Sequence, residues 1–166
     1  IAWWSYFWLN PFNWQPYGGS IWWHGHEMLF GFGASIVVGF LLTAVQTWTG
    51  VMGLRGRPLL FLALAWLLGR LLLAFGAGLP LWVVMAGDLL FLILATIAMA
   101  YPVFKAKQRQ NMIFVPILAI LALLNGVSHW GVVTNQPEVA QLSLHGAIMM
   151  FVLIIAILGG RVIPFF

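Results

Sequence analysis

The sequence predicts an all-α protein, a polytopic bundle of about five helices that cross a membrane. Of its 166 residues, 63% are hydrophobic and only 6% are charged, a composition typical of proteins surrounded by lipid. Apolar stretches of about 20 residues, the length that crosses a bilayer, follow one another along the chain. The predicted spans are residues 23–48, 59–78, 82–104, 112–133 and 137–163.

Each break between two spans has the composition of a turn or loop. The first holds two arginines and Pro58, the second is the short run Gly78-Leu-Pro, the third is basic and the fourth is polar. Glycine, proline and polar side chains favour turns over helix continuation. Residues 164–166 then form the short end that follows the last span.

Positive charge predicts the orientation of the bundle. The first and third breaks hold five Lys and Arg residues, and Arg161 closes the last span, whereas the second and fourth breaks hold none. Cytoplasmic loops carry the excess of Lys and Arg. We therefore expect a multi-pass protein of the bacterial inner membrane whose first span starts at the periplasmic side. The charges are too dispersed for a nucleic-acid surface.

Residues 1–22 are uncharged and rich in Trp, Tyr and Phe, with Pro and Gly between them. Aromatic side chains of this kind gather at membrane interfaces. The segment is interpreted either as an aromatic segment on the outer surface or as the end of an earlier helix followed by such a segment. Because the chain starts at Ile1 with no signal sequence, we expect it to be part of a longer protein.

The four histidines are all predicted near the outer surface. His24 and His26 open the first span, His129 lies about one turn from the outer end of the fourth, and His145 about two turns into the fifth. At 1.5 Å rise per residue, each lies within roughly 12 Å of that boundary. Imidazole is the commonest ligand of copper, zinc and haem iron. All four are candidate cofactor and metal ligands, and we expect imidazoles from separate spans to turn inward toward a common cavity.

The same histidines also allow a plainer interpretation. Each could bond across the bundle or lie in the headgroup layer, and the nearby glycines could simply permit close packing of helices. Alternatively, those glycines could let a flat macrocycle approach the backbone. His24 and His26 are two residues apart and point to nearly opposite sides of a helix, so we do not expect both in one centre. One could ligate while the other bonds to Glu27 or to a carbonyl.

Two charges lie deep inside predicted spans. Arg70 lies about eight residues before the second break, and Asp88 about as far beyond it. An antiparallel hairpin brings them level, and either charge alone is costly in hydrocarbon. We predict a structural ion pair between Arg70 and Asp88, with contact of Arg70 to a haem propionate as the alternative. Asn125 and Ser128 suggest a polar network beside His129, and Met28 is a candidate thioether ligand for which packing is favoured.

Several runs resemble the NnrS family over nearly all of the chain from Trp22 onward. These runs are Trp23-His-Gly-His-Glu-Met-Leu-Phe-Gly-Phe, Gly39-Phe-Leu-Leu-Thr-Ala-Val, Trp48-Thr-Gly, Leu54-Arg-Gly-Arg-Pro, Trp66-Leu-Leu-Gly-Arg and Gly160-Arg-Val-Ile-Pro-Phe-Phe. The resemblance implies a bacterial inner-membrane protein of about a dozen helices that contains haem and copper and is linked to nitric oxide and nitrosative stress. The chain would then correspond to roughly the N-terminal half of such a protein.

The leading hypothesis is a membrane protein that binds haem, and copper as a second candidate, and that responds to nitric oxide or protects against it. With no cysteine in the chain, haem b must be held noncovalently. The expected partners are membrane lipid, the remaining helices of a longer chain or complex, and nitric oxide. The alternatives are a non-catalytic helical subunit of a respiratory complex and a transporter. Whether the protein is an enzyme stays open.

Overall fold

The computed structural model describes residues 2–9 and 14–162, and no strand occurs among them. The helical elements are α1 (Ala2–Leu9), α2 (Ser20–His26), the π-helix η1 (Glu27–Gly33), α3 (Ala34–Thr49), α4 (Arg57–Phe75), α5 (Leu81–Lys105), the 3₁₀ turn η2 (Arg109–Asn111), α6 (Phe114–Val133) and α7 (Pro137–Val162).

Five helices of the described chain are long and apolar enough to cross a membrane. The first runs without interruption through α2, η1 and α3, from Ser20 to Thr49, and the others are α4, α5, the stretch that ends in α6, and α7. The predicted fold class, an all-α bundle with about five membrane-spanning helices, is therefore confirmed.

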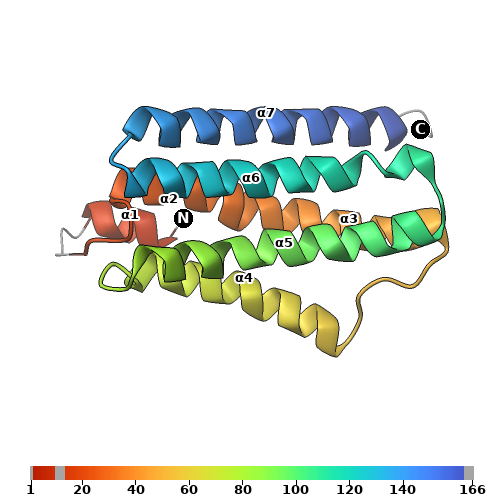
Figure 1. Ribbon diagram of the computed structural model, residues 1–166, viewed down its shortest axis with the longest axis horizontal. Helices are drawn as coiled ribbons and strands as arrows, with labels where there is room; N and C mark the ends of the chain where they lie inside the picture. The colour runs from red at the N-terminus through yellow and green to blue at the C-terminus, as the bar shows by residue number, and fades with distance from the viewer. Residues whose placement is uncertain (1, 10–13, 163–166) are drawn as a thin grey trace.

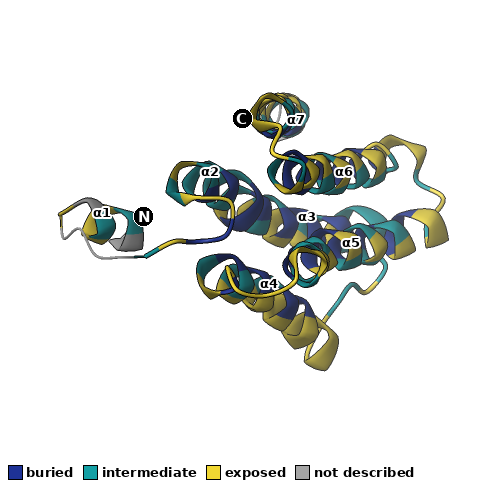
Figure 2. Cartoon of the chain, turned by 60° about the vertical axis from the view of Figure 1, so that its left-hand side comes forward, coloured by how far each residue is buried: buried dark blue, intermediate teal, exposed yellow. Residues whose placement is uncertain are grey.

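Helix α5 lies at the centre of the bundle and packs against α3, α4 and α6. Helix α7 packs on α6 and also reaches α2 and η1, so α4 and α7 form the two flanks (Figure 1). Buried residues lie along the seams between helices, whereas the outer side of α4 is largely exposed (Figure 2). The exposed residues of α4 and α7 include large apolar ones, such as Phe61 and Leu142. Outward-facing apolar side chains are what a lipid environment favours.

The helix ends follow the local sequence. Helix α4 begins beside Pro58 and ends at Phe75, three residues before the end predicted for the span 59–78. A turn follows, in which the amide of Leu79 bonds to the carbonyl of Gly76 at 2.9 Å. Helix α3 ends at Gly50, whose positive φ of 67° suits glycine. The predicted tail at residues 164–166, together with Ile163, lies outside the described residues.

One end of the bundle, called here the histidine end, gathers the start of α2, the α4–α5 turn and the α6–α7 turn (Figure 1). The aromatic segment that precedes α2 is joined to this end: the amide of Tyr17 bonds to the carbonyl of Leu73 at 3.2 Å, and the indole of Trp14 bonds to the carbonyl of Ala74 at 3.0 Å. Residues 2–9 form a short helix, and the described residues 14–17 lie against the bundle end, where Tyr17 is buried.

Candidate metal centre

A carboxylate and two imidazoles meet inside the histidine end. The Oδ2 atom of Asp88, on α5, lies 3.3 Å from Nε2 of His26 on α2 and 3.1 Å from Nε2 of His129 on α6. All three side chains are buried, and both histidines have no exposed surface. Three spans that are far apart in sequence therefore each contribute one metal-ligating group to the same point.

The spacing of these groups suits a single metal ion. His26, Asp88 and His129 each offer a ligand atom, and these atoms lie within 4.8 Å of one another. Metal bonds to imidazole nitrogen and carboxylate oxygen are about 2.0–2.2 Å long, so two ligands at a tetrahedral angle are roughly 3.4 Å apart. The two measured N–O separations are close to that value, and the group could hold a metal.

Polar side chains surround the three ligands. The amide of Asn125 donates to Oδ2 of Asp88 at 2.7 Å, and its carbonyl oxygen lies 2.7 Å from Nε2 of His26. The hydroxyl of Tyr17 lies 3.4 Å from Nδ1 of His129. A partner on the second ring nitrogen, as Tyr17 is for His129, fixes the ring orientation of a metal-ligating histidine. In the described chain, Nδ1 of His26 is buried with no partner.

Tyr17 reaches this centre from outside the membrane spans. Burial, and to a lesser extent the negative charge of Asp88, raises the pKa of Tyr17 above its ordinary value. The phenol therefore stays protonated at neutral pH and can act as a hydrogen-bond partner of His129.

Arg70 connects the centre to a second carboxylate. Its Nη2 donates to Oδ1 of Asp88, and its Nη1 lies 3.0 Å from Oε1 of Glu27. The structure thus places the predicted partners Arg70 and Asp88 in contact and adds Glu27, which had been expected to assist a histidine. Because either carboxylate alone would be strongly unfavourable at this depth, the guanidinium between them stabilises both.

The π-helix η1 makes room for this charge cluster. A Cβ at Gly31 would lie 2.6 Å from Oε2 of Glu27 and would meet the guanidinium of Arg70. The carbonyl of Gly31 also accepts a hydrogen bond of 2.9 Å from the indole of Trp66 on α4. π-helical segments occur often at functional sites, and here the segment brings an unsubstituted backbone against Glu27 and Arg70.

We predict that Gly31→Ala destabilises the protein by about 1–3 kcal/mol, because the added methyl overpacks the buried ion pair. The measurement is thermal unfolding of the detergent-solubilised protein. Gly39→Ala is the matched control in the same continuous helix, since a Cβ there meets no atom within 4 Å. Equal melting temperatures for the two variants would contradict the packing role of Gly31.

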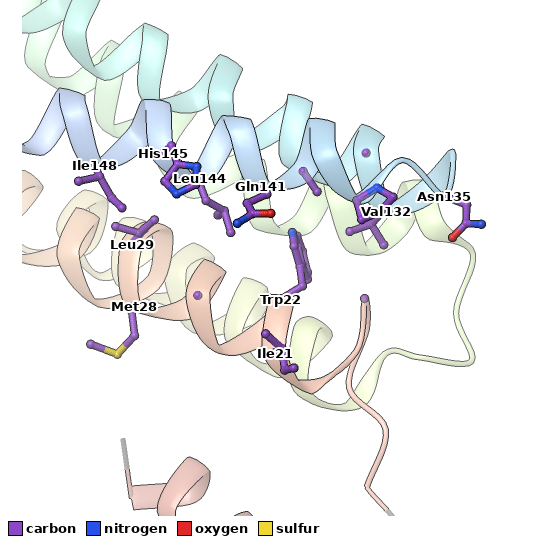
Figure 3. Close-up of a pocket in the computed structure, with 15 residues that line it drawn as sticks. Ile21, Trp22, Met28, Leu29, Val132, Asn135, Gln141, Leu144, His145 and Ile148 are labelled. Carbon is purple, nitrogen blue, oxygen red and sulfur yellow. The ribbon is translucent and has the colours of Figure 1, made fainter.

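The other two histidines lie elsewhere. The ring of His24 stacks on Trp4 of α1, with centroids 4.2 Å apart and planes 6° from parallel. His145 is exposed and lines a separate groove between α2–η1 and α7 (Figure 3). His145 therefore does not join His26 and His129 in one cavity, contrary to our expectation, whereas the separation of His24 from His26 was expected. His24 diverges from His26 because positions two apart on a helix point to different sides.

A family model described as NnrS protein matches residues 1–166. The chain belongs to the NnrS family. No curated protein and no solved structure matches it. Its five apolar spans, together with the family, identify this NnrS protein as a membrane protein.

Sequence reasoning missed two contributors to the centre of this NnrS protein. Tyr17 and Trp22 belong to a segment interpreted as interfacial, yet Tyr17 contacts His129 and the indole of Trp22 donates to Oγ of Ser128 at 2.9 Å. The phenol and the indole N–H were visible signals, because both groups take hydrogen-bond partners when buried. Asn125 and Ser128 were recognised as polar neighbours of His129.

Proposed function

We propose that this NnrS-family protein binds a transition metal ion, with copper favoured, between His26, Asp88 and His129. We further propose that it binds haem b noncovalently and acts in the response to nitric oxide. The observation that carries the proposal is the convergence of two buried imidazoles on one buried carboxylate inside membrane-spanning helices. Ionisable groups at this depth are costly and mark functional sites.

The chemistry of the donors supports a first-row transition metal. Imidazole nitrogen suits copper, zinc and iron, and a carboxylate completes a site of mixed nitrogen and oxygen ligands. The protein supplies a dry environment and fixed ligand orientation, since His26 and His129 are fully buried. Copper bound there would supply one-electron chemistry.

A haem does not fit between His26 and His129. A macrocycle held by both would need its two nitrogens on opposite faces of one plane, whereas here both Nε2 atoms face the same oxygen of Asp88 and the ring centroids are only 5.1 Å apart. The ring of Trp22 lies 4.7 Å from that of His26, and the side-chain oxygen of Asn125 lies 2.7 Å from Nε2 of His26, so both side chains occupy space beside the ring. The buried pair therefore fits a single ion.

The orientation expected from the positive charges belongs to the same proposal. With the α4–α5 and α6–α7 turns free of Lys and Arg, the histidine end would face the periplasm of a bacterial inner membrane. A metal centre near that surface would be accessible to a small uncharged gas that dissolves in the bilayer.

The test is an absorption spectrum with metal analysis of the purified protein. We expect about one copper per chain and a haem Soret band that shifts when nitric oxide is added. His26→Ala and His129→Ala should each lower the copper content at least about tenfold, because each removes one of three ligands. His24→Ala is the matched control and should retain copper, since His24 stacks on Trp4.

Wild-type protein that carries neither copper nor any other transition metal beyond haem iron would reject the proposed metal centre. A Soret band that ignores nitric oxide would reject the proposed role of the haem in binding this gas. Absence of both metal and haem would instead favour a helical subunit of a larger complex.

A further inference from the structure

A groove lies beside the buried centre, between α2–η1 and α7. Its volume is about 750 Å³, and its lining is largely apolar (Figure 3). Cavities of roughly 300–1,000 Å³ with apolar walls and a few polar groups are typical of cofactor and small-ligand sites. The polar side chains of α7 that line it are Gln141 and His145, one helical turn apart.

The imidazole of His145 has no hydrogen-bond partner in the part of the chain that the structure describes. It lies well inside the span Pro137–Gly160 and is exposed to the groove. An imidazole left without a partner at this depth is costly. The groove therefore presents a nitrogen ligand to whatever fills it.

Trp22 separates the groove from the buried centre. Its indole lies 4.7 Å from the ring of His26 and 5.5 Å from that of His129, and the same side chain lines the groove. Its N–H is held by Oγ of Ser128. One aromatic ring thus forms the wall between His145 and the two buried histidines.

The facing wall is open because α2 carries glycine there. A Cβ at Gly25 would already lie 3.4 Å from Cδ1 of Leu144, so a longer side chain at this position would close the space between α2 and α7. Figure 3 shows Leu29 pointing toward α7, whereas Met28 points away from it. The Met28 thioether is therefore poorly placed to oppose His145.

We propose that this groove is a second cofactor site, distinct from the buried centre, and that it holds the haem with His145 as an axial ligand. The inference rests on the proposed function, which includes a haem that does not fit between His26 and His129. In the described lining of the groove His145 is the one imidazole, and a haem held by a single histidine leaves an iron position for a diatomic ligand.

The first experiment measures haem and copper separately in the purified full protein. His145→Gly should lose the Soret band and keep its copper, and added imidazole should restore the band by replacing the missing ring. His129→Ala should lose copper and keep the Soret band. Haem retained in His145→Gly, whether or not His129→Ala keeps its own, would overturn the assignment and leave the proposed function standing.

A second pair of variants tests the groove itself. Ile148→Trp places a large ring in the groove, whereas Leu142→Trp makes a similar change on a part of α7 that is 72% exposed and does not line it. We expect haem occupancy to fall several-fold in Ile148→Trp alone. Equal occupancy in the two variants would overturn the inference. Wild-type protein without haem would overturn both this assignment and the haem part of the proposed function.

Discussion

Asp88→Asn is expected to remove the bound metal and to destabilise the protein by about 3–5 kcal/mol. The carboxylate of Asp88 faces Nε2 of both His26 and His129 through one oxygen and receives Arg70 at the other. The neutral amide replaces the anionic ligand. It also leaves the buried guanidinium of Arg70 with one carboxylate partner, Glu27, in place of two. Copper content should fall at least about tenfold, and denaturant unfolding in detergent measures the stability.

Glu138→Gln is the matched control for this change, because it also deletes one of the three carboxylates of the chain. Glu138 lies exposed in the first turn of α7, and surface substitutions of this kind usually stay within about 0.5 kcal/mol. If Asp88→Asn retained both its copper and its stability, Asp88 would be neither a ligand nor the counter-ion of Arg70.

The fold was predictable because length and composition decide it. A bilayer requires each backbone polar group to be satisfied within its own helix, so five long apolar stretches separated by turn residues leave few alternatives. The boundaries that differ depend on single local features, such as the Gly76 turn that ends α4 at Phe75. The sequence pattern did not indicate the π-helix η1, in which Gly31 lies against Arg70 and Glu27.

The site was only partly predictable, because sequence position gives the depth of a side chain but not its direction around the bundle. All four histidines were expected in one layer, and depth alone could not distinguish His129, which faces Asp88, from His145, which faces the groove. The pairing of Arg70 with Asp88 needed only depth and the strong penalty for isolated charge. The contact of Tyr17 with His129 could not be predicted, because it depends on how the irregular segment before α2 packs against the bundle end.

Asp88 belongs both to the charge cluster with Arg70 and Glu27 and to the candidate metal centre. The same residue therefore connects the stability of the fold with the orientation of a candidate ligand. Asp88 packs its backbone against Gly69 of α4, where a Cβ would come within 3.0 Å of the Cα of Asp88. The close approach of α4 and α5 brings Arg70 to the carboxylate and limits the freedom of Asp88 to turn away from the histidines. An ion pair that holds two helices together thereby also orients a candidate metal ligand.

Arg70→Met is expected to cost about 3–5 kcal/mol, because it leaves Asp88 and Glu27 buried without the cation between them. Arg57→Met is the matched control: Arg57 opens the same helix α4 and is exposed, so its loss should stay within about 0.5 kcal/mol. Methionine preserves much of the apolar stem of arginine, so each substitution removes mainly the positive charge.

A double-mutant cycle then separates the ion pair from general damage. If Arg70 and Asp88 stabilise each other, the combined Arg70→Met and Asp88→Asn protein should be more stable than the sum of the two single losses implies, by about 0.5–3 kcal/mol. The carboxylate left alone by the first change is neutralised by the second, so part of the penalty disappears. Strict additivity would show that the contact contributes no coupling, and Arg70 would then act through Glu27 alone.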